Sequence, residues 1–503
     1  MNLPNITIVN GAGGLQRPPA GQDHIAGLIA YMSTLPSGFT STDRTKKVLS
    51  LNQATSLGIN LNYVDATAPT GTVTITAVGS NGDTLTITHV NVKGATVNLG
   101  TYTKVSADTT VTNVATKVRN IINAGTNVHG YTATNAAGVV TITAPKFNGV
   151  YAGTLATTIV GGITATLAQF SGGTASPIAC LYYHVSEFFR LMPNGELYIH
   201  IASAYGTNFE EVATLVNFAQ GKIRQIGVMN DLSTAFASTQ VTKLQTQATA
   251  AFNAFRPCVI LFAPEISGTS DLSTLPDTSG YNSAQVAIII SQDAGNVGKY
   301  IALSTGKSLS DLGAKLGVLS TSKVSDSWAW VGAYNMTNGS ELNTIGFSNG
   351  TDYTTAEGNG VLNQLVTYGY SFLRKIVDYT GTYNTQPNTA TLESSDYRFL
   401  YSNRVIQKAG RVERLAMVPF QSSPVLLNAD GTLTELSIQT WIAAINQQLD
   451  VMVRNGELSN YLVTIDPTQL ILQTNSVSIA VQLQPVGVAD YITITNTFTL
   501  QIA

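Results

Sequence analysis

Apolar and polar residues alternate over the last stretch of the chain, Asp490–Ile502. From residue 492 on, the even-numbered positions are apolar except for Asn496, and the odd-numbered positions are mostly threonine. The apolar positions are Ile492, Ile494, Phe498, Leu500 and Ile502. A period of two with β-branched residues predicts a half-buried β-strand. Because a long uncharged strand edge promotes aggregation when bare, we expect this strand either to pair within its own sheet or to add to a neighbour's sheet.

The sequence just upstream predicts a compact C-terminal module over residues 396–503. A period near 3.6 predicts helices over 402–415 and 437–455, the second ended by Gly456. A further alternating stretch follows, and Pro485–Gly487 would then connect it to the terminal strand as a hairpin. The apolar positions of that stretch are Val477, Ile479, Val481 and Leu483. We therefore predict an α+β module that ends in a β-hairpin.

The composition changes sharply between residues 67 and 176, which contain neither glutamate nor tryptophan and are rich in threonine, valine, alanine and glycine. Clean alternation predicts strands, and Asn81-Gly82 fits a tight hairpin turn between the first two. The predicted strands include 72–76, 84–88 and 139–143, and a helix is predicted over 111–123. We predict an inserted, threonine-rich, sandwich-like β domain.

Residues 177–395 switch to an alternation of short apolar runs with helical patterns. The apolar runs are 197–201, 223–228, 258–263 and 286–290. Buried apolar strands that alternate with helices imply a mostly parallel sheet covered on both faces. A further helix is predicted over 361–377. The fold class predicted for the whole chain is therefore α/β, with the inserted β domain and the C-terminal α+β module attached.

Composition narrows the function classes. Charged residues make up 11% of the 503 residues, against about 25% in an average soluble domain. The net charge of −3 argues against general electrostatic capture of nucleic acid. Met1–Asn10 lacks the pattern of a signal peptide, and no apolar run is long enough to span a bilayer, so we expect a soluble protein made in a bacterial cytoplasm.

The candidate chemistry is sparse. Asp231, Glu265 and Asp293 follow the carboxyl ends of predicted strands, where α/β sheets bind ligands, and three carboxylates could hold a divalent metal. Neither Gly11–Gly14 nor Ser304–Ser308 has all the glycines of a nucleotide-binding loop at the required spacing. The five histidines and two cysteines show no metal-ligand spacing. We predict no catalytic residue, no cofactor and no metal site.

Basic residues, scarce elsewhere, cluster on the helix predicted over 402–415. Their spacing forms a ridge, which we call the basic ridge, of Arg404, Lys408, Arg411 and Arg414. We predict that the basic ridge is an exposed charged contact. Its candidate partners are carboxylates of an adjacent subunit or of an inner tube, with Asp450 and Glu457 as the carboxylates offered by this chain.

The order of features in the last third of the chain resembles contractile tail sheath proteins, the sheath subunits of myophage tails and of phage-derived injection systems. The resemblance is carried by Ser395–Tyr397, Asn403–Arg411, a glycine-containing loop at 428–433, the amphipathic helix and the hairpin ending. It covers residues 1–66 and 177–503. The threonine-rich insertion resembles the decoration domains of phage structural proteins.

This resemblance implies a structural subunit that forms stacked hexameric rings around an inner tube and contracts to drive that tube through a target envelope. The implied partners are further copies of the chain, the inner tail tube protein, the baseplate and the tail terminator, without nucleic acid or membrane insertion. Residues 1–66 would supply an N-terminal arm, with Ile6 and Ile8 in a short strand, and start the core. That strand and the C-terminal strand would each add to the sheet of a neighbouring subunit, which we call lacing, within a virion tail or injection particle.

Two alternatives remain open at this point. One is an α/β carbohydrate-active or metal-dependent enzyme that uses the three strand-end carboxylates and carries a carbohydrate-binding insertion. The other is a surface-layer protein or adhesin, against which the absence of a signal-peptide pattern argues.

Overall fold

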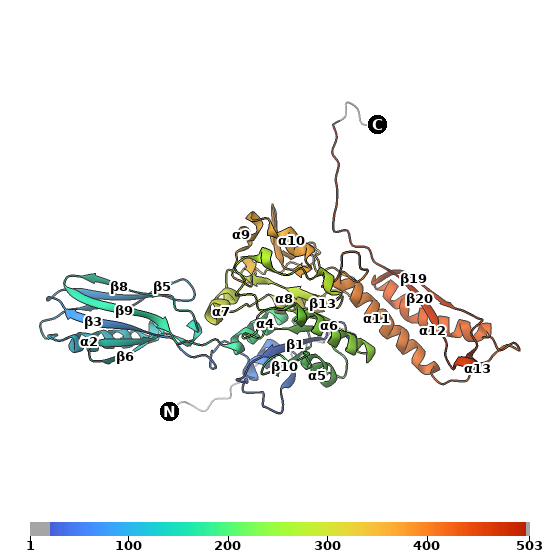
Figure 1. Ribbon diagram of the computed structural model, residues 1–503, viewed down its shortest axis with the longest axis horizontal. Helices are drawn as coiled ribbons and strands as arrows, with labels where there is room; N and C mark the ends of the chain where they lie inside the picture. The colour runs from blue at the N-terminus through green and yellow to red at the C-terminus, as the bar shows by residue number, and fades with distance from the viewer. Residues whose placement is uncertain (1–20, 499–503) are drawn as a thin grey trace, which may run out of the picture.

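The computed structural model describes residues 21–498. Three bodies follow one another along its longest axis: a β-rich insertion at one end, an α/β core in the middle and a C-terminal α+β module at the other end (Figure 1). The predicted α/β fold class is confirmed.

A seven-stranded sheet forms the centre of the core, in the order β16-β13-β12-β11-β1-β10-β2. Every neighbouring pair is parallel except β10 and β2, which run antiparallel at one edge. The strands are β1 (Ala26–Tyr31), β2 (Thr45–Val48), β10 (Leu197–Ala202), β11 (Gln225–Val228), β12 (Val259–Phe262), β13 (Val286–Ile289) and β16 (Tyr370–Ser371). The predicted parallel sheet is confirmed, but β1, which lies inside the sheet between β11 and β10, was not predicted.

Helices cover both faces of this sheet. A Cβ on Gly27 of β1 would lie 2.7 Å from Leu215 of α5, whereas a Cβ on Gly227 of β11 would lie 3.4 Å from Leu312 of α8. Gly227 pairs with Leu28, so Cβ positions on these two residues point to the same face of the sheet. Gly27 is the neighbour of Leu28 along β1, so its Cβ position points to the other face, and α5 and α8 therefore lie on opposite faces. The covering helices are α4 (Pro177–Leu191), α5 (Glu211–Phe218), α6 (Ser238–Asn253) and α8 (Leu312–Thr321).

Shorter elements complete the core. They are α1 (Leu51–Ser56), β14 (Ser291–Asp293), α7 (Val297–Thr305), β15 (Ile345–Phe347), α9 (Tyr353–Gly358), α10 (Val361–Thr367), β17 (Leu373–Ile376) and β18 (Tyr379–Asn384). The helix predicted over 361–377 is wrong beyond Thr367. Gly369 takes a left-handed conformation with φ +87°, and the next residues form β16, which pairs with β13.

The insertion contains two antiparallel sheets, of order β6-β7-β3-β9 and β5-β4-β8, and a helix, α2. The elements are β3 (Thr70–Val78), β4 (Thr84–Val90), β5 (Thr96–Thr103), α2 (Val111–Ala124), α3 (Thr126–His129), β6 (Thr132–Ala136), β7 (Val139–Thr143), β8 (Thr154–Val160) and β9 (Ile163–Ser171). The predicted hairpin at Asn81-Gly82 is wrong. The chain turns there, with Gly82 at φ +91°, but both edges of β3 are taken by β7 and β9, so β4 starts the other sheet.

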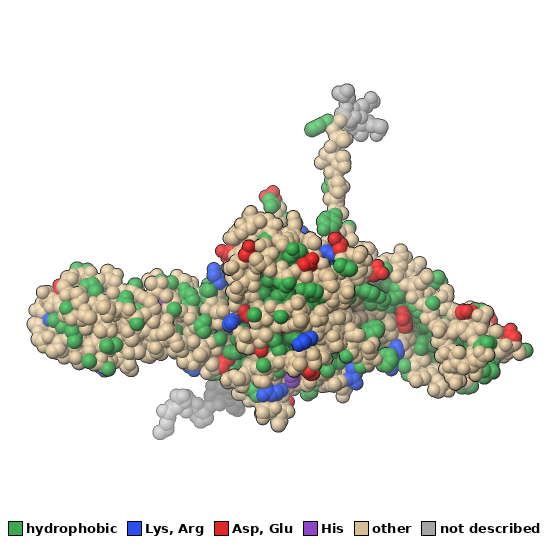
Figure 2. Space-filling view, viewed as in Figure 1, with side chains coloured by type: hydrophobic (Ala, Val, Ile, Leu, Met, Phe, Trp, Pro, Cys, Tyr) green, Lys and Arg blue, Asp and Glu red, His purple; other side chains and the backbone are tan. Residues whose placement is uncertain are grey.

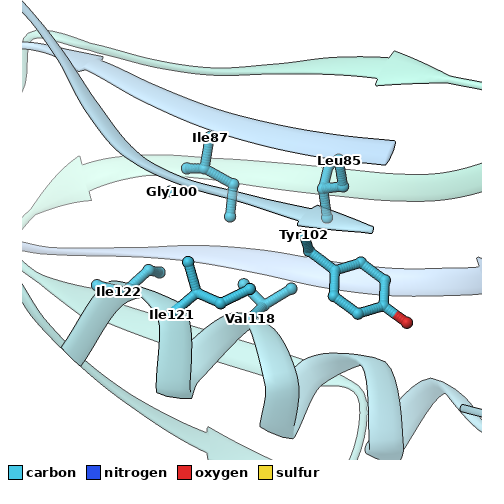
Figure 3. A pocket seen from close by; sticks show the side chains of 7 residues that line it. All are labelled: Leu85, Ile87, Gly100, Tyr102, Val118, Ile121 and Ile122. Carbon is cyan, nitrogen blue, oxygen red and sulfur yellow. The ribbon is translucent and has the colours of Figure 1, made fainter. Parts of the chain in front are cut away.

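The helix α2 packs tightly on the second sheet, as Figure 3 shows. Val118, Ile121 and Ile122 of α2 face Leu85 and Ile87 of β4, with Gly100 and Tyr102 of β5 between them. Gly100 has a φ of +145°, and a Cβ there would lie 2.3 Å from the Cγ2 of Ile121. The absence of a side chain at this position therefore sets how closely the helix approaches the sheet.

The two connections between the insertion and the core run side by side. The amide of Thr174 donates to the carbonyl of Thr67 at 3.2 Å. Ser176 already belongs to the core, because its hydroxyl accepts from Ala179 N at the start of α4 and donates to Asp65. A further contact joins Val150 N to the carbonyl of Ser304, 2.8 Å away at the end of α7.

The C-terminal module contains two long helices and a two-stranded antiparallel sheet. Its elements are α11 (Leu400–Met417), α12 (Glu435–Arg454), β19 (Leu458–Ile465), α13 (Ile471–Thr474) and β20 (Ile479–Pro485). Val405 and Ala409 of α11 pack with Ile445 and Leu449 of α12 and with Val463 of β19. Both predicted helices are confirmed. None of the helices described in this structure is long and apolar enough to cross a membrane.

We expect Gly100→Ala to destabilise the insertion by about 1–3 kcal/mol, because the new methyl group collides with Ile121 and the backbone is in a region that disfavours side chains. Hydrogen exchange should become faster in β4, β5 and α2 and stay unchanged in the core sheet. Gly162→Ala is the matched control, since its Cβ would lie 3.6 Å from the nearest atom. Equal protection in both variants would contradict the close approach of α2.

Candidate assembly surface

The C-terminal segment Val486–Phe498 leaves the molecule as an extended arm, which we call the C-terminal arm (Figure 1). It forms no strand with any residue that the structure describes. Ile492 is 80% exposed and Ile494 77% exposed, and Phe498 is fully exposed. Figure 2 shows the arm standing clear of the rest of the surface. Of the other predicted lacing residues, Ile6, Ile8, Leu500 and Ile502 lie outside the described residues.

The predicted hairpin between β20 and the terminal strand is wrong. β20 pairs along its length with β19, from Ile465 opposite Ile479 to Leu458 opposite Pro485. After Pro485 the chain does not fold back on β20. The first of the two expectations for the terminal strand, pairing within its own sheet, is therefore excluded for residues 490–498, and addition to another chain stays a prediction.

The sheet of β19 and β20 is itself incomplete. It has only these two strands among residues 21–498, so each of them has one unpaired edge. One face is covered, since Leu458, Val463 and Ile465 are buried while Ser459, Leu462 and Thr464 alternate outward. An isolated two-stranded hairpin is at best marginally stable in water, so packing on α12 and further strands are what stabilise such a sheet.

Arg404 is the innermost residue of the basic ridge. It is only 4% exposed, and its guanidinium donates to Ser322 Oγ at 2.9 Å and to the Lys323 carbonyl at 3.2 Å, just after α8 ends. Burial lowers the pKa of Arg404 to about 10, which leaves it charged at neutral pH. The expectation of an exposed ridge is therefore wrong at Arg404, which fastens α11 to the core.

Lys408 and Arg411 are half-buried and meet carboxylates of their own chain. Lys408 Nζ lies 2.6 Å from Asp23 and 2.5 Å from Glu457, and Arg411 lies 2.8 Å from Asp23. Burial would raise the pKa of Asp23, but the charges of Lys408, Arg411 and Arg404 outweigh it and hold that pKa below its usual value. The structure thus brings together Lys408 and Glu457, two of the predicted residues, and adds Asp23, which sequence reasoning missed.

The remaining predicted charges lie apart from this cluster. Arg414 is exposed, with its guanidinium carbon 4.2 Å from the ring centroid of Phe255. Asp450 accepts from the Tyr461 hydroxyl at 2.6 Å, which ties α12 to β19. Figure 2 shows charged side chains scattered over the visible face rather than gathered in one patch. A contact of these residues with another subunit stays a prediction.

The three strand-end carboxylates are separate from one another and accept hydrogen bonds from their own surroundings. Asp231 accepts from the Ser233 hydroxyl, and Glu265 accepts from Asn230 at 2.7 Å. Asp293 accepts from three backbone amides that lead into α7. Among residues 21–498, no group of three or more histidine, cysteine, aspartate or glutamate side chains is placed to hold a metal ion.

The family and fold follow from comparison with known proteins. The model of the DUF2586 N-terminal domain matches residues 85–388, and that of the DUF2586 C-terminal domain matches residues 396–503. No curated protein matches the chain.

Solved structures of contractile systems are similar to this chain. The helical sheath of the anti-feeding prophage (AFP) in its contracted state is 14% identical, with a TM-score of 0.50 over 99% of each chain. The AFP baseplate is 13% identical, with a TM-score of 0.49 over 99% of this chain and 100% of that one. The PVC sheath complex in its contracted state is 14% identical, with a TM-score of 0.40 over 64% of this chain and 80% of that one. The likeness to the AFP sheath shows a shared fold.

We expect Arg404→Glu to lower the free energy of unfolding by about 3–5 kcal/mol, because it places a carboxylate against the buried oxygens of Ser322 and Lys323. Arg414→Glu is the matched control on the same helix. It is exposed and loses only a cation–π contact, worth about 0.5–1 kcal/mol. Urea unfolding followed by tryptophan fluorescence measures both. If Arg404→Glu proved as stable as the control, the buried fastening of α11 would be contradicted.

Proposed function

We propose that this chain, which belongs to the DUF2586 family, is the structural subunit of a contractile tail sheath. Copies polymerise as stacked hexameric rings around an inner tube and contract to drive the tube through a target envelope. The observation that carries the proposal is the exposed, alternating C-terminal arm, in a chain that shares the fold of the AFP sheath.

The arm and the two-stranded sheet are complementary. The arm offers backbone donors and acceptors over Tyr491–Phe498, and β19 and β20 each offer an open edge. Strand addition joins backbone groups of one chain to those of another, while alternate side chains fit the covered face. In this proposal Ile492, Ile494 and Phe498 turn toward α12 of the neighbouring copy, and the threonines face solvent.

The proposed partners follow from this role. They are further copies of the chain, the inner tail tube protein, the baseplate and the tail terminator, in a virion tail or injection particle assembled in the bacterial cytoplasm. The N-terminal arm within residues 1–66 laces a second neighbour in the same way. The role is structural rather than catalytic, which agrees with strand-end carboxylates that already accept hydrogen bonds from their own loops.

The insertion, residues 67–176, has a position that suits an outer decoration. It lies at the opposite end of the core from the C-terminal module (Figure 1). Its core is a separate cluster around Val73, Ile87 and Val118. In this proposal residues 177–395 form the sheath core and residues 396–503 the assembly module, so lacing does not need the insertion.

Electron microscopy of the purified chain tests the function directly. A sheath subunit should form rings or tubes of regular diameter. A chain that stays monomeric at high concentration and in the presence of its tube protein would argue against the proposal.

We expect truncation after Asp490 to leave a folded protein that does not polymerise. The truncation removes residues that the described fold does not use, since Tyr491 is 86% exposed. Circular dichroism reports folding and light scattering reports assembly. Within the full chain, Ile494→Pro should also block assembly because proline has no amide to donate, whereas Ile494→Val should assemble normally. Tubes formed by the truncated chain would show that the arm does not lace subunits.

We expect a chain in which Gly-Gly replaces residues 68–173 to fold and assemble. Thr67 and Thr174 are hydrogen-bonded neighbours, so a two-residue connection spans the gap. A deletion that also removes Ser176 is the matched control, and it should be less stable by about 1 kcal/mol through loss of the α4 cap. Thermal unfolding and electron microscopy measure the two. Failure of the first deletion to fold would make the insertion part of the core.

A further inference from the structure

A cavity of about 350 Å³ lies at the carboxyl ends of β12 and β13. Its walls come from Ser267, which follows β12, from Gln292 and Ala294 in and after β14, and from Phe347 at the end of β15. One side is formed by α7, which lies at the end of the core nearest the insertion (Figure 1). Ligands of open α/β sheets bind at this edge of the sheet, and the volume falls in the range of small-molecule sites.

Two lysines give the cavity a positive charge. Lys299 of α7 and Lys307, just after it, both line the cavity. Neither forms an ion pair with any residue in the part of the chain that the structure describes. The carboxylate of Asp352 also lines the cavity, so the three charged side chains leave a net charge of +1. In a chain with only 26 basic residues, two of them in one cavity are unusual.

The cavity wall also contains a buried amide side chain. Gln292 of β14 lines the cavity and is 6% exposed.

The cavity also has an apolar part. Ala294, Ala302, Leu303 and Phe347 line it together with the polar groups. An inorganic ion would leave these side chains without contacts, whereas a small organic anion would cover them. A few placed polar groups in a partly apolar cavity are typical of small-molecule sites.

We propose that this cavity is a binding site for a small organic anion that carries a carboxylate or phosphate group. Lys299 and Lys307 bind the charged group. The site is distinct from the assembly surface, and the proposal does not depend on the sheath function. Although Lys307 belongs to the Ser304–Ser308 motif, it acts here as a wall of the cavity and not as part of a nucleotide-binding loop.

Isothermal titration calorimetry of the full chain tests the site, with citrate as the carboxylate probe and glycerol 3-phosphate as the phosphate probe. Glycerol is the neutral control. We expect saturable binding of one of the two anions with one site per chain. The double variant Lys299→Gln with Lys307→Gln should weaken that binding at least tenfold. Lys222→Gln, at an exposed lysine outside the cavity, should leave it unchanged.

Saturable binding lost in the double lysine variant supports the proposal. No saturable binding of either anion, or equal affinity in the double variant and the unaltered chain, would overturn it.

Discussion

Backbone pairing is the constraint on which the proposed assembly of this protein depends. The C-terminal arm has a strand sequence, yet its isoleucines and its backbone face water, and the sheet of β19 and β20 stops at two strands. Each of these features is unfavourable alone, because bare strand edges promote aggregation and two-stranded sheets are marginal. Each becomes favourable when one chain supplies what the other lacks. In the proposed sheath, the arm of one copy meets the open sheet edge of another, so each copy supplies what its neighbour lacks.

The helix α11 connects that assembly module to the core. It crosses the amino ends of the parallel strands, where Arg411 meets Asp23 just before β1 and Gln407 donates to the carbonyl of Cys258 just before β12. Lys408 binds Asp23 and also Glu457 just before β19. One side chain thus joins the point where the N-terminal segment enters the core to the point where the C-terminal sheet begins. Removing one member of such a partly buried pair leaves the other charge uncompensated, so the entry to β1, helix α11 and the start of β19 depend on one another.

The sequence predicted what depends on local pattern and missed what depends on distant partners. Several parallel strands were recognisable as continuous apolar runs, but β1 was not, because the small residues Ala26, Gly27 and Ala30 interrupt its large apolar side chains. The turn at Asn81-Gly82 was visible, although a turn signal does not say which strands pair. The spacing of Arg404 and Lys408 placed them on one helix face, while their burial depends on Ser322 and Asp23, and Asp23 lies 388 residues away from Arg411. The period of the C-terminal arm was readable, but only the fold could show that its own sheet leaves it unpaired.

The two ends of the parallel strands differ in how their basic residues are paired. At the amino ends, helix α11 places Lys408 and Arg411 against Asp23 and Glu457 of the same chain. At the carboxyl ends, Lys299 and Lys307 line the cavity, and neither forms an ion pair with a residue among 21–498. In an open parallel sheet, the loops that follow the strands lie at the carboxyl ends and leave a crevice between them. Ligands bind in that crevice. The proposed ligand site therefore lies at the edge of the sheet opposite the ion pairs of α11.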